Sequence, residues 1–301
     1  MPHDHHHHHH VDPEAGDGRV ALAVAVNLLL TVAQIVGGVL SGSVALIADA
    51  IHNLSDALTL VIAFSARRIA RRPADATMTF GYGRAEVVAA LVNYTSLILI
   101  SIWLAGEALL RLFHPPHVAG GIVIVLAGIA LVVDLATAGL TYAMSKNSMN
   151  IRAAFLHNLA DAGTSVAVIV SGGLILLYDW RLADPLVTLA ISGWILWHAL
   201  REIGPVIRIL MLGAPPDVGV EALIERIGGI AGVSGVHHLH LWQIDEHETS
   251  IEAHLVVDRP GAEAEVRQLL RRDFGIRHAT FQIEAPDAQC ADPHLIGHGA
   301  H

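Results

Sequence analysis

Long apolar runs separated by short polar links fill the first two thirds of the chain. Between residue 20 and about residue 212, Ala, Val, Leu, Ile and Gly dominate these runs. Each run is close to the roughly 20 residues that a helix needs to cross a bilayer. We therefore predict transmembrane helices at 20–40, 44–69, 85–113, 118–145, 151–178 and 184–203. The expected architecture of residues 17–212 is an α-helical membrane domain with six transmembrane helices.

The positive charges of the links predict the orientation of these helices. Lys and Arg gather between spans two and three, between spans four and five, and after span six, whereas the opposite links hold few. Because Lys and Arg prefer the cytoplasmic side of a membrane, we expect both termini to be cytoplasmic. The chain is then an integral, multi-pass protein of the lipid bilayer, and the plasma (inner) membrane is the expected location.

After residue 213 the pattern changes to that of a small α+β domain. Helical periodicity near 218–227 and 262–274 alternates with strand patterns near 236–244, 250–257 and 278–284. The order αββαβ predicts a ferredoxin-like cytoplasmic domain over residues 213–287, with helices on one face of the sheet. Residues 288–301 are expected to form a flexible tail.

Composition narrows the classes of function. The 301 residues are 53% hydrophobic and only 15% charged, which is too apolar for an ordinary soluble domain. A formal net charge of −10 and the lack of a basic stripe argue against nucleic acid as a partner. The single Cys290 excludes a disulfide framework and a multi-cysteine zinc site, so metal chemistry should rest on His, Asp and Glu. Within the separate segment 1–16, His5 to His10 are either an expression tag or a native metal-binding segment.

A repeated His-to-Asp spacing is the most informative motif. His52 precedes Asp56 by four residues in the second span, and His157 precedes Asp161 by four residues in the fifth. Residues i and i+4 share a helix face, so each span presents one imidazole and one carboxylate to the same side. Two such faces opposite each other give the four nitrogen and oxygen ligands that suit tetrahedral zinc.

Carboxylates inside a span require an explanation, because each costs about 2.5 to 3.5 kcal/mol on insertion scales. A lone Asp or His there is readily explained by hydrogen bonding or packing, but packing does not demand the same spacing twice. Asp49 lies three residues before His52 and so on nearly the same face. It is a candidate proton relay or outer partner of the site, and an ordinary helix-packing polar group is the alternative.

Four segments resemble the cation diffusion facilitator family, and within it the zinc transporters. They are SGSVALIADAIHNLSD at 41–56, FGYGRAE at 80–86, HNLAD at 157–161 and VHHLHLW at 236–242. The resemblance implies that His52, Asp56, His157 and Asp161 are the transport-site ligands, with a preference for zinc. It also implies a homodimer.

The same resemblance implies a second metal site in the cytoplasmic domain. His237, His254 and Glu284 match its ligand positions, and His240 and His278 are further candidates. The alternative for these residues is ordinary surface polarity on strands. Bound Zn²⁺, both transported and regulatory, is the only cofactor expected.

The resulting hypothesis is a secondary active transporter, not an enzyme. It exports Zn²⁺, with Cd²⁺, Co²⁺ or Ni²⁺ as further candidates, in exchange for protons by alternating access at the two-His, two-Asp site. No Gly-rich loop ending in Lys-Ser or Lys-Thr is visible, so no ATP site is predicted. Two rivals remain open: a membrane-embedded zinc hydrolase, and a membrane-anchored metal sensor.

Overall fold

The computed structural model of the chain describes residues 13–145, 149–290 and 293–297. Within its helices, the side chains of Asp56 and His157 also lie outside the described part. The histidine run at 5–10 lies outside it as well.

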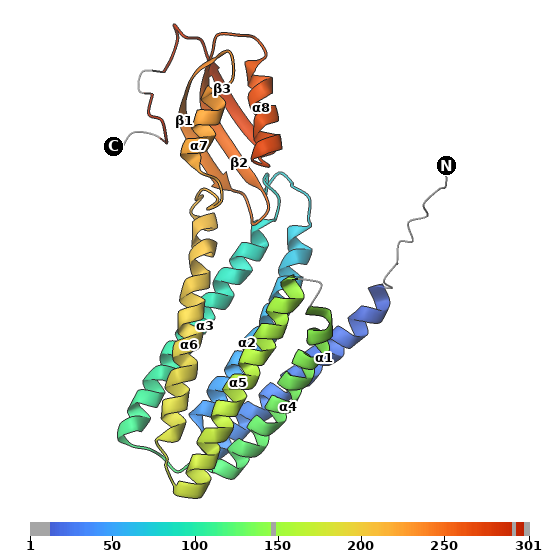
Figure 1. The fold of residues 1–301 in the computed structure, drawn as a ribbon, viewed down its shortest axis with the longest axis vertical. Coiled ribbons are helices and arrows are strands. Elements are labelled where there is room, and N and C mark those ends of the chain that lie inside the picture. The colour runs from blue at the N-terminus through green and yellow to red at the C-terminus, as the bar shows by residue number, and fades with distance from the viewer. Residues whose placement is uncertain (1–12, 146–148, 291–292, 298–301) are drawn as a thin grey trace. The chain divides into compact units, whose positions relative to one another are not determined.

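Six long helices make up the first part of the described chain (Figure 1). They are α1 (Pro13–Ser41), α2 (Val44–Ala70), α3 (Arg84–Phe113), α4 (Gly120–Ser145), α5 (Met149–Tyr178) and α6 (Ala183–Leu210). Within the described residues, the apolar stretches of α3, α4, α5 and α6 are long enough to cross a membrane. Asn27–Ser41 in α1 and Val44–Ser55 in α2 are shorter apolar helical stretches.

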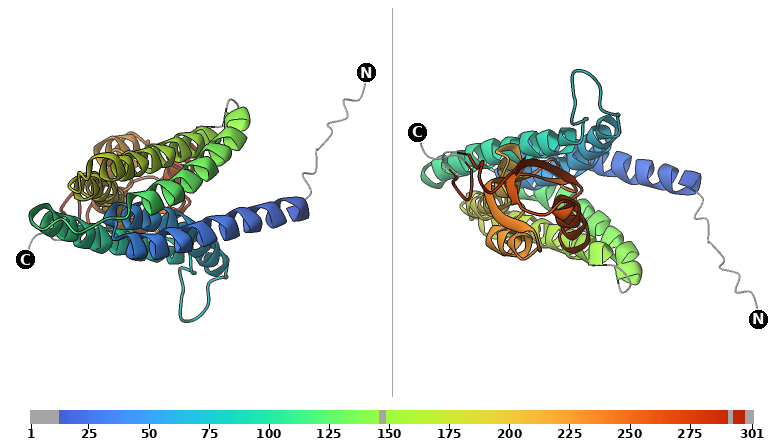
Figure 2. Two further views of the ribbon diagram at one scale, coloured as in Figure 1. Left: turned by 90° about the horizontal axis from the view of Figure 1, so that it is seen from below. Right: turned by 90° about the horizontal axis from the view of Figure 1, so that it is seen from above.

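The chain divides into two compact units. The first comprises Met1–Val61 and Ser96–Ala199, and the second Ile62–Thr95 and Leu200–His301. In the first unit, α4 packs along α5, and α1 packs along α4 (Figures 1 and 2). Buried Leu46, Leu104 and Val123 belong to its core. Many large apolar side chains on these helices are exposed, which suits a surface that faces hydrocarbon.

The start of α2 is fixed by a carboxylate from another helix. Gly42 makes the turn from α1 with a φ of 77°, a conformation that favours glycine. The hydroxyl of Ser43 accepts a hydrogen bond from the Leu46 amide at 3.0 Å, as an N-cap does. Asp184, buried near the start of α6, accepts hydrogen bonds from the hydroxyl of Ser43 and the amide of Val44. These contacts fix the position of the first residues of α2 relative to the start of α6.

The remaining elements form a small α+β domain: α7 (Val220–Gly228), β1 (Val233–Gln243), β2 (Thr249–Val257), α8 (Ala262–Asp273) and β3 (His278–Glu284). This is the predicted element order. The strands form a three-stranded sheet in the order β1-β2-β3, in which β2 runs antiparallel to β1 and parallel to β3. Leu223 of α7 and Leu270 of α8 are fully buried in the same core as Ile251 of β2.

Strand β1 is irregular in its middle. His237 pairs with His254 of β2, but the next pair is His240 with Glu252, so β1 carries a bulge between them. His238 in this bulge has a φ of 49°, which is uncommon for a residue other than glycine. The segment after β3, predicted to be a flexible tail, makes backbone hydrogen bonds to β1 at this bulge.

Candidate metal centres

The first candidate centre joins α2 and α5. Nε2 of His52 lies 3.0 Å from Oδ1 of Asp161, and both side chains are largely buried. The helices therefore bring together one residue from each of the two predicted ligand pairs. An imidazole nitrogen and a carboxylate oxygen at this distance are a typical start of a divalent-metal site.

The other two predicted ligands are Asp56 and His157. Each belongs to the same helix as its partner, α2 or α5, four residues away. Their side chains lie outside the described part of the structure, so their membership of the site stays a prediction.

Asp49 stands beside this pair in a hydrogen-bond network. Its Oδ2 accepts a hydrogen bond of 2.8 Å from Nε2 of Gln34 on α1. The hydroxyl of Thr164 on α5 lies 2.8 Å from Asp49 Oδ1 and 2.8 Å from the carbonyl oxygen of Asp161. Thr164 thus connects the Asp49 carboxylate to the helix turn that carries Asp161.

The sequence reasoning missed Thr164, although a signal was available. Thr164 follows Asp161 by three residues, so the two share a helix face. The network also extends to α2, since Nδ2 of Asn53 lies 3.5 Å from Oε1 of Gln34.

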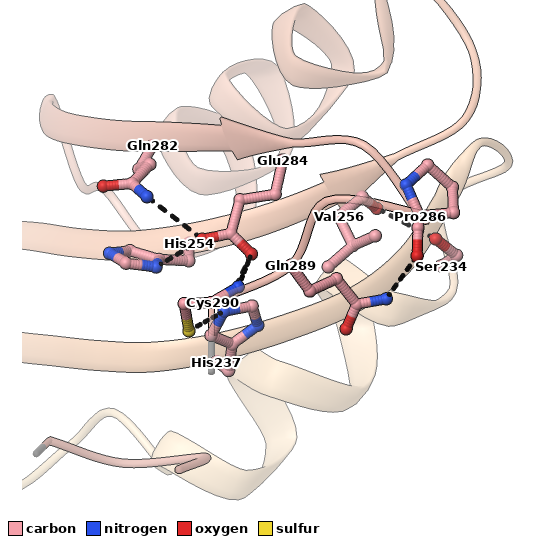
Figure 3. A network of polar contacts seen from close by, with 9 residues as sticks. All are labelled: Ser234, His237, His254, Val256, Gln282, Glu284, Pro286, Gln289 and Cys290. Carbon is pink, nitrogen blue, oxygen red and sulfur yellow. Dashed lines mark hydrogen bonds and ion pairs between the residues drawn. The ribbon is translucent and has the colours of Figure 1, made fainter. Parts of the chain in front are cut away.

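The second candidate centre lies on three adjacent strands of the C-terminal domain (Figure 3). Nε2 of His237 on β1 lies 3.1 Å from Oε2 of Glu284, the last residue of β3. Nδ1 of His254 on β2 lies 2.8 Å from Oε1 of Glu284. The sulfur of Cys290 lies 3.1 Å from His237 Nε2. The four ligand atoms all lie within 4.8 Å of one another.

These four donors fit a metal ion. Zinc bonds of about 2.0 to 2.3 Å place the ligands of a tetrahedron roughly 3.3 to 3.8 Å apart, close to the spacing here. Within the described part of the chain, Nδ1 of His254 is buried and makes no hydrogen bond of good geometry despite its closeness to Glu284.

The Glu284 carboxyl is held in its charged form. Burial raises its pKa, but the Cys290 amide hydrogen bond and the neighbouring His237 and His254 outweigh burial and lower the pKa below its ordinary value. A metal would therefore meet an ionised carboxylate, the form in which it ligates.

Three of the five ligands predicted in this domain come together, and two do not. His240 pairs across the sheet with Glu252, and His278 lies 3.9 Å from Glu248, so neither belongs to the described cluster. The expectation that metal chemistry rests on His, Asp and Glu did not include Cys290, which lies in this cluster. Cys290 lies far from His237 along the chain, so no local sequence pattern links the two. A turn after β3 brings Cys290 next to His237.

Two family models match the chain. The cation efflux transmembrane domain matches residues 20–211, and the cytoplasmic domain of cation efflux proteins matches residues 215–286. The chain belongs to the cation efflux family. This confirms the resemblance to the cation diffusion facilitators.

Curated relatives cover most of this cation efflux protein. It is 36% identical over 259 residues to the cadmium, cobalt and zinc/H(+)-K(+) antiporter of Bacillus subtilis, covering 83% of each chain. It is 33% identical over 314 residues to the zinc transporter ZitB of Escherichia coli, covering 100% of this chain and 99% of that one. A solved metal-bound C-terminal domain of the CzcD transporter is 29% identical and covers 22% of this chain and 99% of that one, with a TM-score of 0.21.

The family assignment confirms the prediction of a non-enzymatic function. The relatives are named as transporters and antiporters of metal cations, and a hydrolase is not among these names. The cation efflux protein is therefore a membrane protein of helical spans with a small C-terminal domain.

Proposed function

We propose that this protein exports Zn²⁺ from the cytoplasm in exchange for protons, by alternating access at a site made by His52, Asp56, His157 and Asp161. The observation that carries the proposal is the 3.0 Å approach of His52 Nε2 on α2 to Asp161 Oδ1 on α5. The repeated His-to-Asp spacing supplies the other two ligands, and the relatives supply the substrate class: zinc, cadmium and cobalt.

Ligand chemistry supports proton exchange. A metal binds neutral imidazole and ionised carboxylate, so protons and metal compete for the same atoms. An ordinary histidine titrates near pH 6.5, which lets a modest pH difference across a membrane bias this competition. The name of the Bacillus subtilis relative includes both H⁺ and K⁺ as exchanged ions, so potassium is tested beside the proton.

The apolar helices and the charges of the links between them give the arrangement in the membrane. All six helices α1–α6 span the bilayer, both termini are cytoplasmic, and the membrane is the inner (plasma) membrane. The positive links and the six apolar helices support this topology.

The C-terminal domain is ferredoxin-like and cytoplasmic, and two copies of the chain form a homodimer. The match to a cytoplasmic domain model named for dimers supports both statements.

The C-terminal cluster is a regulatory metal site within this function. His237, His254, Glu284 and Cys290 hold zinc that is sensed and not transported. Three of them lie on a sheet with its own core and Cys290 follows its last strand, so none lies on the spans.

Zinc uptake into everted membrane vesicles tests the proposal. We expect Asp161→Asn and His52→Ala to abolish uptake, because each removes a ligand. The matched controls are Asp179→Asn, in an exposed link, and His198→Ala, exposed on α6. Both controls should transport normally.

Ion coupling is tested in proteoliposomes with a proton gradient or a potassium gradient imposed separately. We expect zinc movement to follow the proton gradient and to carry a matching pH change. Transport that ignores a collapsed pH gradient, or that follows potassium alone, contradicts proton exchange. Normal uptake by Asp161→Asn contradicts the site.

A further inference from the structure

The segment after β3 returns to the sheet and covers its open edge. In the sheet order β1-β2-β3, β1 is an edge strand among the described strands. The amide of His238 donates to the carbonyl of His294 at 2.7 Å, and the amide of Leu239 to that of Leu295 at 3.2 Å. The Gly297 amide donates back to the Leu239 carbonyl at 3.1 Å, and Leu239 pairs with Ile296 in a parallel bridge.

These bonds fall at the bulge of β1. The paired register of β1 against β2 passes from His237 to His240, so the bulge spans His238 and Leu239. The amides of these two residues donate to the carbonyls of His294 and Leu295 on the other side of β1. Short pairing of this kind is marginal in water by itself, so something else must hold the segment in place.

Cys290 is positioned to do so. A turn in which the Ala288 amide donates to the Ala285 carbonyl at 3.0 Å reverses the chain after β3. The Cys290 amide then donates to Glu284 Oε2 at 3.1 Å, and its sulfur faces His237 Nε2 (Figure 3). The other three donors of the cluster belong to strands, whereas Cys290 belongs to the returning segment.

We propose that metal binding at the C-terminal site, through its ligand Cys290, latches residues 294–297 onto β1. The metal takes the Cys290 sulfur as a thiolate, and the thiol proton passes to solvent. Without metal, the segment lacks this ligand bond and leaves the bulge more readily. The inference rests on the metal site of the proposed function and adds to it a segment that moves when metal binds.

A thiolate also restricts which ions close the latch. Soft sulfur favours zinc and cadmium, whereas Mg²⁺, Ca²⁺ and Mn²⁺ prefer oxygen ligands. The latch therefore responds to the metals that the relatives are named for and ignores abundant hard cations.

The chain offers a native probe for this inference, because Cys290 is its one cysteine. The full-length protein in detergent, stripped of metal, is treated with a maleimide, and the labelled fraction is followed by intact mass. We expect Zn²⁺ to slow labelling of Cys290 on the order of tenfold or more, since a ligated thiolate is shielded, and Mg²⁺ to leave the rate unchanged. Asp161→Asn keeps the protection, because the membrane site is not involved, whereas Glu284→Gln loses it.

Two further measurements separate the ligand from the latch. Cd²⁺ should give an ultraviolet thiolate-to-metal charge-transfer band that disappears in Cys290→Ser. Hydrogen exchange at the amides of His238, Leu239 and Gly297 should slow on zinc binding in the wild type and not in Cys290→Ser. In both proteins, unchanged exchange in α8 and β2 shows that the domain stays folded.

Several results overturn the proposal. One is zinc that binds in a Glu284-dependent manner while Cys290 labels at the same rate. Another is protection of Cys290 without any change in exchange at Leu239 and Gly297, which removes the latch. A third is a domain that binds no zinc. Vesicle uptake of zinc is independent of all three, so the transport proposal stands or falls separately.

Discussion

His52 Nε2 on α2 and Asp161 Oδ1 on α5 lie 3.0 Å apart, although 109 residues separate them in the chain. The contact joins two helices that the sequence marks with the same His-to-Asp spacing. It is a pair of groups that costs energy in a membrane unless the charge is neutralised or a metal is shared. We therefore expect His52 and Asp161 to bind the same ion.

A double-mutant cycle tests whether His52 and Asp161 act on one ion. His52→Ala and Asp161→Ala should each weaken zinc binding by about 100-fold or more, since each removes a ligand. The double variant should be far less than additively worse, because the site is already broken. Zinc binding to the full-length protein in detergent, measured by calorimetry, checks this. Strictly additive losses contradict a shared site.

The Thr164 hydroxyl should raise the zinc affinity of the membrane site without being a ligand. Thr164→Val removes the hydrogen bond to Asp49 Oδ1 and should lower zinc affinity about 10- to 100-fold, the usual cost of losing an outer partner. Thr137→Val is the matched control, because its hydroxyl donates to the backbone carbonyl of Val133 on its own helix, on an exposed face of α4. Equal effects of the two variants on zinc affinity argue against a role for the Asp49 network.

The Asp184 carboxylate should stabilise the membrane unit through α2. Asp184→Ala leaves the Ser43 hydroxyl and the Val44 amide without their acceptor, and should cost about 1 to 2 kcal/mol, as loss of a helix cap does. Asp217→Ala, an exposed site in the link after α6, is the control. Thermal unfolding in detergent gives the two values. If Asp184→Ala is as stable as Asp217→Ala, the prediction is wrong and water replaces the carboxylate as acceptor.

Zinc should stabilise the C-terminal domain through Glu284. At a free zinc concentration 100 times the dissociation constant, the added stability is about 2.7 kcal/mol. Glu284→Gln should abolish this gain, whereas Glu252→Gln, exposed on β2, should retain it. Hydrogen exchange of the sheet amides, with and without zinc, measures both. A gain that survives Glu284→Gln places the metal elsewhere.

Local sequence patterns were sufficient for the elements and for one pair of side chains that lie close together. The apolar runs predicted six helices whose positions agree with α1–α6 to within a few residues at most ends, and the αββαβ order was read correctly. His52 and Asp161 were found because helical geometry makes an i, i+4 spacing visible in the chain.

The sequence did not show the partners that come from distant segments. Thr164 was missed beside Asp49, and Cys290 was set aside because it is a lone cysteine in a segment expected to be a tail. His240 and His278 were predicted as further ligands from the family resemblance. They lie outside the described cluster, and for His240 this follows from the register of β1 against β2 with its bulge.

The sequence by itself determined that this chain crosses a membrane and carries two His-to-Asp pairs at helical spacing, because hydrophobicity and periodicity are local properties. Only the tertiary structure decided which of these groups meet: His52 with Asp161, Thr164 with Asp49, and Cys290 with His237. The physical reason is that a metal or a proton responds to distances of about 3 Å between side chains. Such distances are set by helix packing, strand register and a single turn after β3, none of which is encoded in any short stretch of the chain.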